Sequence, residues 1–225
     1  MTSHPYYPLG VEIKDYQPND RPLLELVGYF SLGLAGIIGI IFATALYTRP
    51  SMPRGDRLSI LWFALSGILH CFFEGYFVVN HQRMGPSQDL LGQLWKEYAK
   101  SDSRYLIADP FVVSIEAITV VVWGPLSLLV AFLTTIQHPL KHPLRIIVCV
   151  AHLYGDSLYY ATSLFDHYVN GIPYSRPEAL YFWVYYVFMN FIWIVVPAGL
   201  LYSSVRTVSR ALQTFDQVSE QKKAD

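Results

Sequence analysis

His70 and Glu74 stand four residues apart inside an apolar stretch long enough to cross a membrane, and Glu116 interrupts the next such stretch. An ionisable side chain in the hydrocarbon region costs about 2.5–3.5 kcal/mol on insertion scales, so it usually faces a protein-lined cavity. In a dry site one carboxyl group can donate a proton and another can accept one near neutral pH. An imidazole can relay the proton between them. These three residues therefore indicate proton transfer on an apolar substrate.

The composition is typical of an integral membrane protein. Of the 225 residues, 53% are hydrophobic and 15% are charged, whereas soluble domains contain roughly 25% charged residues. The net charge of -1 gives no bulk attraction to nucleic acid, which we do not expect as a partner. Cys71 and Cys149 lie in apolar stretches without metal-ligand spacing, and we interpret them as small buried hydrophobic residues.

Five apolar stretches approach the roughly 20 residues that a helix needs to cross a bilayer. We therefore predict an all-α integral membrane protein, a bundle of five transmembrane helices with a ligand pocket inside the membrane. The fourth stretch is the most polar and gives the weakest signal. The predicted spans are 23–47, 58–79, 111–136, 144–164 and 180–202.

The orientation is predicted from the basic residues and from the end of the sequence. Lys222 and Lys223 resemble a dilysine retrieval signal, which acts only on a cytosolic tail. Lys and Arg are slightly more frequent on the same side, in agreement with the positive-inside rule. We expect a lumenal segment (1–22), a transmembrane domain (23–205) and a cytosolic tail (206–225), in the endoplasmic reticulum membrane.

The one long connection, residues 80–110, carries apolar residues at helical spacing. This pattern fits an amphipathic helix that lies at the membrane interface. It fits equally well a helix that packs as a lid over the mouth of the bundle. The apolar positions are Leu90, Leu91, Leu94, Trp95 and Tyr98.

Counting depth along the predicted spans places the two carboxylates at the same level. With a rise of about 1.5 Å per residue, Glu74 and Glu116 each lie roughly 7 Å from the lumenal ends of their spans. His70 lies one turn deeper than Glu74 on the same helix face. In the fifth span, Asn190 is about 15 Å deep, and Trp193 follows one turn later on the same face. All five side chains can point into one pocket in the lumenal half of the bundle.

Other side chains could assist chemistry in such a pocket. The ring face of Trp193 could stabilise a cation, worth roughly 0.5–2 kcal/mol per contact. Asn190 could orient a carboxyl group, or it could simply link two helices. The sequence has no nucleophile beside a base, no glycine-rich phosphate loop and no cofactor fingerprint. Further candidates for lining the pocket are Tyr105, Thr119, Trp123, His152, Asp156 and Tyr186.

The ionisable residues also have structural interpretations. His70 and Glu74 could be a hydrogen-bonded pair that locks two helices, and Glu116 could be a satisfied contact between helices. His152 and Asp156, also four residues apart, form a second polar pair that could be structural or could line the pocket. The convergence of His70, Glu74 and Glu116 at similar depth favours function.

Several long segments of the sequence resemble those of the emopamil-binding protein family, the 3β-hydroxysteroid Δ8,Δ7-isomerases of sterol biosynthesis. The resemblance extends from about Pro18 to Thr207 and covers nearly all of the membrane part. The matching segments are PNDRP near the start, GILHCFFEGYFV around His70 and Glu74, LWKEYAKSDSRY at 94–105, SIEAIT and WGPLSL around Glu116 and Trp123, LYGDSLYY at 153–160, and LYFWVYYVFMNFIW ending at Trp193.

The resemblance implies a reaction that moves the ring double bond of an 8-ene sterol to the 7-position without a cofactor or metal. Protonation at carbon 9 gives a cation at carbon 8, and loss of a proton from carbon 7 gives the product. By match of motif, His70, Glu74 and Glu116 transfer protons, Asn190 supports them and Trp193 faces the cation. We expect Glu116 with His70 to form the donor, and Glu74 to accept the proton from carbon 7.

The resemblance also implies partners and alternatives. Amphipathic amines would bind as mimics of the cation, membrane lipid would surround the bundle, and a second copy or another sterol-pathway enzyme could associate with it. A non-catalytic sterol- or amine-binding protein of the sigma-2-receptor type would need only one carboxylate. A proton-coupled transporter is disfavoured because the sequence has no inverted repeat. The presence of both Glu74 and Glu116 with His70 favours the isomerase.

Overall fold

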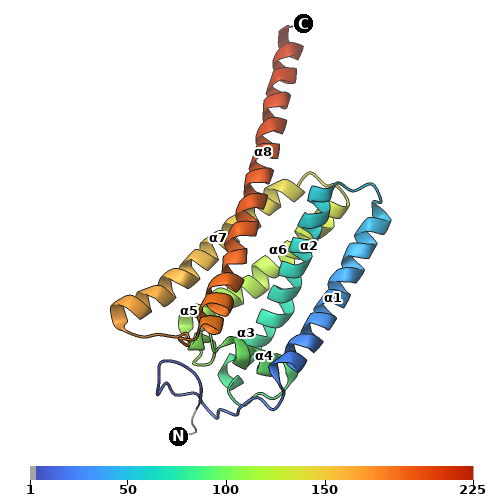
Figure 1. The fold of residues 1–225 in the computed structure, drawn as a ribbon. Helices are drawn as coiled ribbons and strands as arrows, with labels where there is room; N and C mark the ends of the chain where they lie inside the picture. Colours follow the sequence, from blue (N-terminus) through green and yellow to red (C-terminus); the bar gives the residue numbers. More distant parts are fainter. Residues whose placement is uncertain (1–3, 225) are drawn as a thin grey trace.

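The computed structural model describes residues 4–224, in which all the regular elements are helices (Figure 1). The prediction of an all-α fold is confirmed. The elements are α1 (Leu23–Thr48), α2 (Arg54–Ile68), η1 (Leu69–Glu74), α3 (Gly75–Asn80), η2 (His81–Arg83), α4 (Leu90–Tyr98), η3 (Ser103–Tyr105), α5 (Pro110–Ile118), η4 (Thr119–Trp123), α6 (Gly124–Thr135), α7 (Lys141–Phe165), η5 (Asp166–Asn170), η6 (Leu180–Phe188) and α8 (Met189–Ala224).

Four continuous helices are long and apolar enough to cross a membrane. They contain the first, second, third and fifth predicted spans. The fourth predicted span lies within α7, which packs along α8 and beside α6. α7 is long enough to cross a bilayer but is not among the four, because polar residues such as Arg145, His152 and Asp156 make its sequence less apolar. The four helices are Leu23–Thr48, Arg54–Arg83, Pro110–Thr135 and Leu180–Lys223.

The last helix continues far beyond the predicted span, which ends at residue 202. α8 runs to Ala224 and projects out of the bundle (Figure 1), so the polar tail is helical and exposed. After Gly199 the sequence contains neither glycine nor proline, the two residues that most strongly end a helix. Helix formation therefore persists where the apolar pattern stops.

A lid closes the end of the bundle near the N-terminus. We use this name for residues 4–22 together with α4, which begins at Asp89 as its N-cap and is largely buried. The Tyr6 hydroxyl donates to Lys96 O over 2.9 Å, and Lys96 Nζ donates to Gln17 O over 2.8 Å. Gln93 Oε1 accepts two backbone N–H groups of the same segment. α4 is thus enclosed by protein, which supports its interpretation as a lid.

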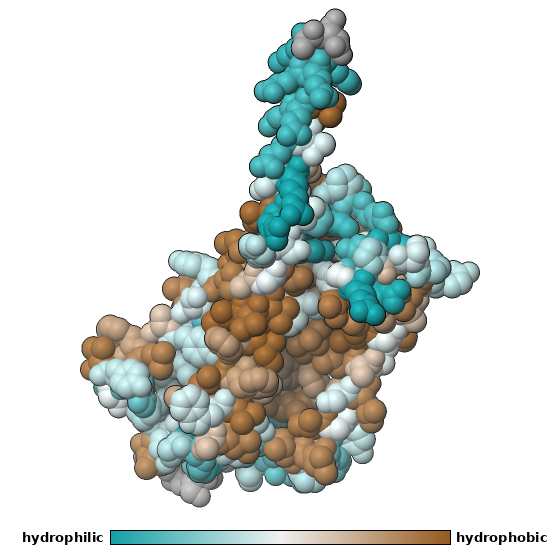
Figure 2. All heavy atoms as spheres, turned by 45° about the horizontal axis from the view of Figure 1, so that its top comes forward, coloured by the Kyte–Doolittle hydropathy of each residue, from teal (hydrophilic) through white to brown (hydrophobic). Residues whose placement is uncertain are grey.

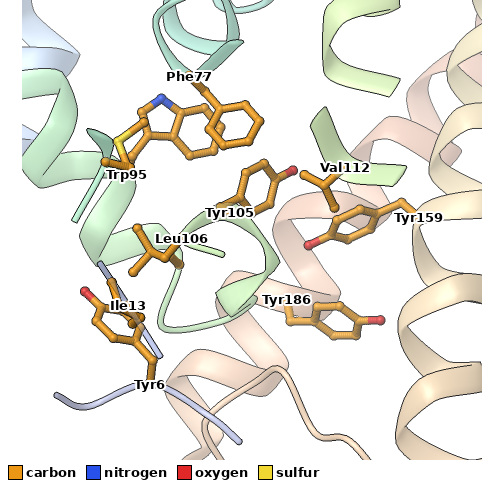
Figure 3. Close-up of a cluster of buried hydrophobic side chains, with 11 residues drawn as sticks. Tyr6, Ile13, Phe77, Trp95, Tyr105, Leu106, Val112, Tyr159 and Tyr186 are labelled. Carbon is orange, nitrogen blue, oxygen red and sulfur yellow. The ribbon is translucent and has the colours of Figure 1, made fainter. Parts of the chain in front are cut away.

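The buried side chains form an aromatic cluster beneath this lid. In Figure 3, rings from the N-terminal segment, α3, α4, the connection after α4, α7 and η6 converge on one another. Trp95 stacks on Phe73 with ring centroids 4.4 Å apart, and its Nε1 donates to Phe73 O over 3.0 Å. A second cluster, centred on Phe63 and Val148, joins α2, α6 and α7. The polar residues of interest lie among these clusters.

Candidate active site

His70 and Glu74 are joined on a π-helical turn, η1. His70 Nδ1 lies 2.8 Å from each carboxylate oxygen of Glu74. Residues four apart on a helix lie on the same face, one above the other, and the wider π turn keeps this arrangement. The His70 side chain is 6% exposed and that of Glu74 is 16% exposed. The predicted pair is present, on a wider helical turn than its spacing suggested.

Glu116 reaches the same site from the third long helix. α5 begins with Asp109, whose carboxylate accepts the Val112 N–H, and with Pro110 in the first turn. Two turns later, Glu116 Oε1 accepts a hydrogen bond of 2.7 Å from the Tyr105 hydroxyl. The Glu116 carboxyl is also close enough to Glu74 to interact with it. The two carboxyl groups therefore face one another, as the depth count predicts.

A glycine allows the two helices to approach at this level. The second π turn of the site, η4, packs against η1, and Gly124 follows it. A Cβ atom on Gly124 would lie 2.6 Å from Cys71 Sγ and 3.2 Å from His70 Cβ. The backbone of α6 thus touches the turn that carries His70. π turns are frequent at functional sites because they re-aim side chains within a helix.

His70 is enclosed on its other side by α7 and α8. Its Nε2 lies 3.1 Å from Nε2 of His152, and its ring centroid lies 5.0 Å from that of Trp193. The Trp193 ring also packs on His152 at 5.4 Å and on Trp62 at 4.9 Å. Trp193 therefore presents a large ring beside the His70–Glu74 pair, where the sequence places it.

The predicted pair of His152 with Asp156 is not formed. His152 turns instead to His70, and Asp156 Oδ2 is buried without a hydrogen-bond partner among residues 4–224. Spacing along one helix brings two side chains to the same face, but contact with another helix decides which partner each one takes.

Asn190 is linked to the site through tyrosines. Its Oδ1 accepts from the Tyr98 hydroxyl over 3.3 Å, and its Nδ2 donates to Tyr186 O over 2.7 Å. The Tyr98 ring lies 5.4 Å from that of Tyr105. Burial raises the pKa of both phenols, so both remain hydrogen-bond donors. Tyr98 was not predicted as a site residue; its position on the apolar face of residues 90–98 was the available signal.

The side chains of the remaining pocket candidates form no hydrogen bond with the three ionisable residues within the described part of the chain. The Thr119 hydroxyl donates to Ile115 O within its own helix. Trp123 is partly buried in η4, and Tyr186 packs on Tyr159 with ring centroids 5.9 Å apart. Of the six candidates, Tyr105 and His152 are therefore the ones that hydrogen-bond to Glu116 and His70.

The sequence is similar to one family model and to several known proteins along most of its length. A model of the family described as EXPERA (EXPanded EBP superfamily) matches residues 90–204. The chain is 38% identical over 217 residues to the 3-beta-hydroxysteroid-Delta(8),Delta(7)-isomerase of Rattus norvegicus, covering 95% of this chain and 92% of that protein. It is 39% identical over 220 residues to the enzyme of the same name from Cavia porcellus, with the same coverage of 95% and 92%. It is 35% identical over 184 residues to an isomeliandiol synthase of Ailanthus altissima, covering 80% and 83%.

Proposed function

Because this chain belongs to the EXPERA (EXPanded EBP) superfamily, we propose that it is a 3β-hydroxysteroid Δ8,Δ7-isomerase, an enzyme of sterol metabolism. The observation that carries the proposal is the meeting of two carboxyl groups and a histidine in one buried site. Two carboxyl groups this close repel each other when both are ionised, which favours a state in which one holds a proton. The site can thus present an acid and a base together.

The proposed donor is Glu116. Its carboxyl is buried and is held by the Tyr105 hydroxyl, which fixes its direction. Protonation of the 8-ene sterol at carbon 9 breaks the ring double bond and leaves a cation at carbon 8. The sequence suggests His70 as a partner of the donor, but its hydrogen bond to Glu74 supports a place on the side of the base.

The proposed base is Glu74, held by His70. Removal of the proton from carbon 7 forms the new double bond and returns the ring system to neutrality, so one proton enters and one leaves. His70 orients the Glu74 carboxylate by a hydrogen bond from Nδ1. General acids and bases placed in this way contribute about 10²- to 10⁴-fold each.

The proposed cation lies beside the Trp193 ring. A ring face within about 6 Å attracts a cation, and the attraction grows when water is excluded. The lid and the aromatic cluster beneath it close one end of the site to water. An amphipathic amine that places its ammonium group at this point would imitate the cation and would bind tightly.

We propose five membrane crossings, with α7 as the fourth, in the endoplasmic reticulum. α7 is 25 residues long and packs along α8, so its polar side chains face protein. The basic residues Arg206, Arg210, Lys222 and Lys223 on the projecting part of α8 support a cytosolic position for that end, and the lid would then be lumenal.

The proposed access route for the sterol is lateral, from the bilayer. Most side chains of α1 are exposed, with Leu26 and Ala45 buried near its two ends. Figure 2 shows an apolar hollow in the face between α1 and α8. An apolar substrate dissolved in lipid could reach the bundle interior there without passing through water.

Expression in yeast that lacks its own sterol isomerase tests the function. We expect 8-ene sterols to be converted to 7-ene sterols, as measured by mass spectrometry. Persistent 8-ene sterols in the presence of the folded, well-expressed protein would contradict the proposal. If that folded protein also bound an amphipathic amine, the non-catalytic binding protein would be the better interpretation.

A further inference from the structure

His152 meets His70 in a way that constrains the protons of both rings. Each contributes Nε2 to a contact of 3.1 Å, and His152 is 7% exposed. Two imidazole nitrogens at this distance form a hydrogen bond only if one carries a proton and the other a lone pair. The contact therefore specifies a donor and an acceptor, and the surroundings of the two rings decide which is which.

The Glu74 carboxylate determines which nitrogen of His70 carries the proton. An ionised carboxylate accepts hydrogen bonds and cannot donate, so His70 Nδ1 carries the proton that joins it to Glu74. In a neutral His70 the other nitrogen, Nε2, then holds a lone pair and must accept. His152 Nε2 must consequently donate.

The other nitrogen of His152 leads to the same conclusion. His152 Nδ1 is buried and has no hydrogen-bond partner among residues 4–224. A buried N–H without a partner is rarer than an under-satisfied acceptor. The tautomer with its proton on Nε2 directs that proton to His70 and leaves only a lone pair without a partner.

We propose that His152 is a positioning residue that donates its Nε2–H to His70 Nε2 and so fixes the His70 tautomer whose Nδ1–H faces Glu74. In this role His152 acts through His70, since it has no direct contact with Glu74 in the structure. It keeps His70 from placing its proton on Nε2, which would leave Glu74 without its hydrogen bond. The inference rests on the proposed function, in which Glu74 is the base that takes the proton from carbon 7.

The titratable groups around His70 are few. Its own long helix presents Glu74 and Cys71, α5 presents Glu116 beyond Glu74, and α7 presents His152. α8 presents Trp193, which does not titrate. A change at position 152 therefore acts on a small and defined set of groups.

The first test is made on the unsubstituted protein in lipid bilayers, labelled with ¹⁵N-histidine, by solid-state NMR. We expect a protonated Nδ1 and an unprotonated Nε2 for His70, and a scalar coupling between the two Nε2 atoms across the hydrogen bond. The His152→Gln variant assigns the signals by removing one partner. A His70 with its proton on Nε2, or two rings without the coupling, overturns the inference. This readout needs neither substrate nor a substitution that could unfold the protein.

The second test is kinetic. We expect His152→Leu to lower kcat about tenfold with little change in KM, and His152→Gln, whose amide N–H can donate to the same nitrogen, to restore most of the loss. The matched control is His142→Gln on the same helix, whose side chain faces Ser204.

The possible results distinguish a failure of the inference from a failure of the proposed function. A His152→Leu enzyme with unchanged kcat and unchanged His70 signals overturns the inference, as does a His152→Gln enzyme that loses as much kcat as His152→Leu. If His152→Leu does not fold, the spectrum of the unsubstituted protein decides. If the unsubstituted protein shows the coupling but no isomerase activity, the proposed function fails while the hydrogen bond and the tautomer stand.

Discussion

The Tyr105 hydroxyl donates a hydrogen bond of 2.7 Å to Glu116 Oε1 and so ties the connection after α4 to the third long helix. Burial, and the nearby Glu116 carboxyl, raise the pKa of Tyr105 well above its usual value, so the phenol stays protonated. The turn η3, which follows the lid along the chain, therefore supplies a lasting hydrogen-bond donor to the proposed acid, Glu116.

Tyr105→Phe tests this link. The proposed donor Glu116 becomes a carboxylate as it gives up its proton, and a hydrogen bond to a charged group is worth about 1.5–3 kcal/mol, so we expect kcat to fall roughly 10- to 100-fold. Sterol conversion by the purified enzyme measures the effect. The matched control is Tyr159→Phe, since the Tyr159 hydroxyl is buried without a hydrogen-bond partner among residues 4–224. Equal losses in the two variants would argue against a specific role of Tyr105.

Glu74→Gln and Glu116→Gln test the acid and the base. Each change keeps the size of the side chain and removes its ability to exchange a proton, so we expect activity to fall about 10²- to 10⁴-fold. Asp156→Asn is the comparison, because Oδ2 of this carboxyl on α7 is buried without a hydrogen-bond partner among residues 4–224. Near-normal turnover in both glutamine variants would show that the site assignment is wrong, even if the enzyme is an isomerase.

Gly124→Ala tests the approach of α6 to the turn that carries His70. The added methyl group would lie 2.6 Å from Cys71 Sγ, so the turn must shift, and we expect kcat to fall roughly 10- to 100-fold. Gly155→Ala is the control, because nothing lies within 4 Å of its added Cβ. Full activity of Gly124→Ala would mean that the site tolerates displacement of this turn.

The buried ion pair of Asp102 and Arg104 predicts a change in stability. Arg104 Nη2 lies 2.6 Å from Asp102 Oδ2, and the two side chains are 1% and 0% exposed. Arg104→Met leaves a buried carboxylate unpaired, which costs about 3–5 kcal/mol and lowers Tm on the order of 10 °C. Thermal unfolding in detergent measures it. Glu178→Gln, which breaks the more exposed pair with Arg176, should leave Tm unchanged.

Lys96 predicts a pH dependence of stability. Burial lowers the pKa of Lys96 from its usual 10.5 to about 8. Between these values the unfolded chain binds more protons than the folded protein, so stability contributed by this group rises with pH from about 8 to about 10.5. Comparing Tm at about pH 7.5 and about pH 9.5, we expect Lys96→Met to lose part of the rise seen in the unsubstituted protein. Identical pH dependence in the two proteins would contradict the prediction.

The sequence by itself determined the helical class and pointed to the main residues of the candidate site. Apolar length placed four of the five predicted spans in helices able to cross a membrane, since each helix satisfies its own backbone hydrogen bonds. The cost of burying charge identified His70, Glu74 and Glu116 without any knowledge of their contacts. Helical geometry then predicted that Glu74 lies beside His70 on one helix, and that Glu116 lies at the same depth on the next helix.

Only the tertiary structure decided how these residues are paired. His152 meets His70 from a position 82 residues away, although its spacing suggested Asp156. Tyr105 reaches Glu116 from the short 3-10 helix η3, and the two long helices touch at their π turns, η1 and η4. Such contacts depend on how whole helices pack against each other, which the spacing of residues along one helix does not fix. For the same reason the sequence fits α4 equally well as an interfacial helix and as a lid. The hydrogen bonds of its polar side chains to the N-terminal segment favour the lid.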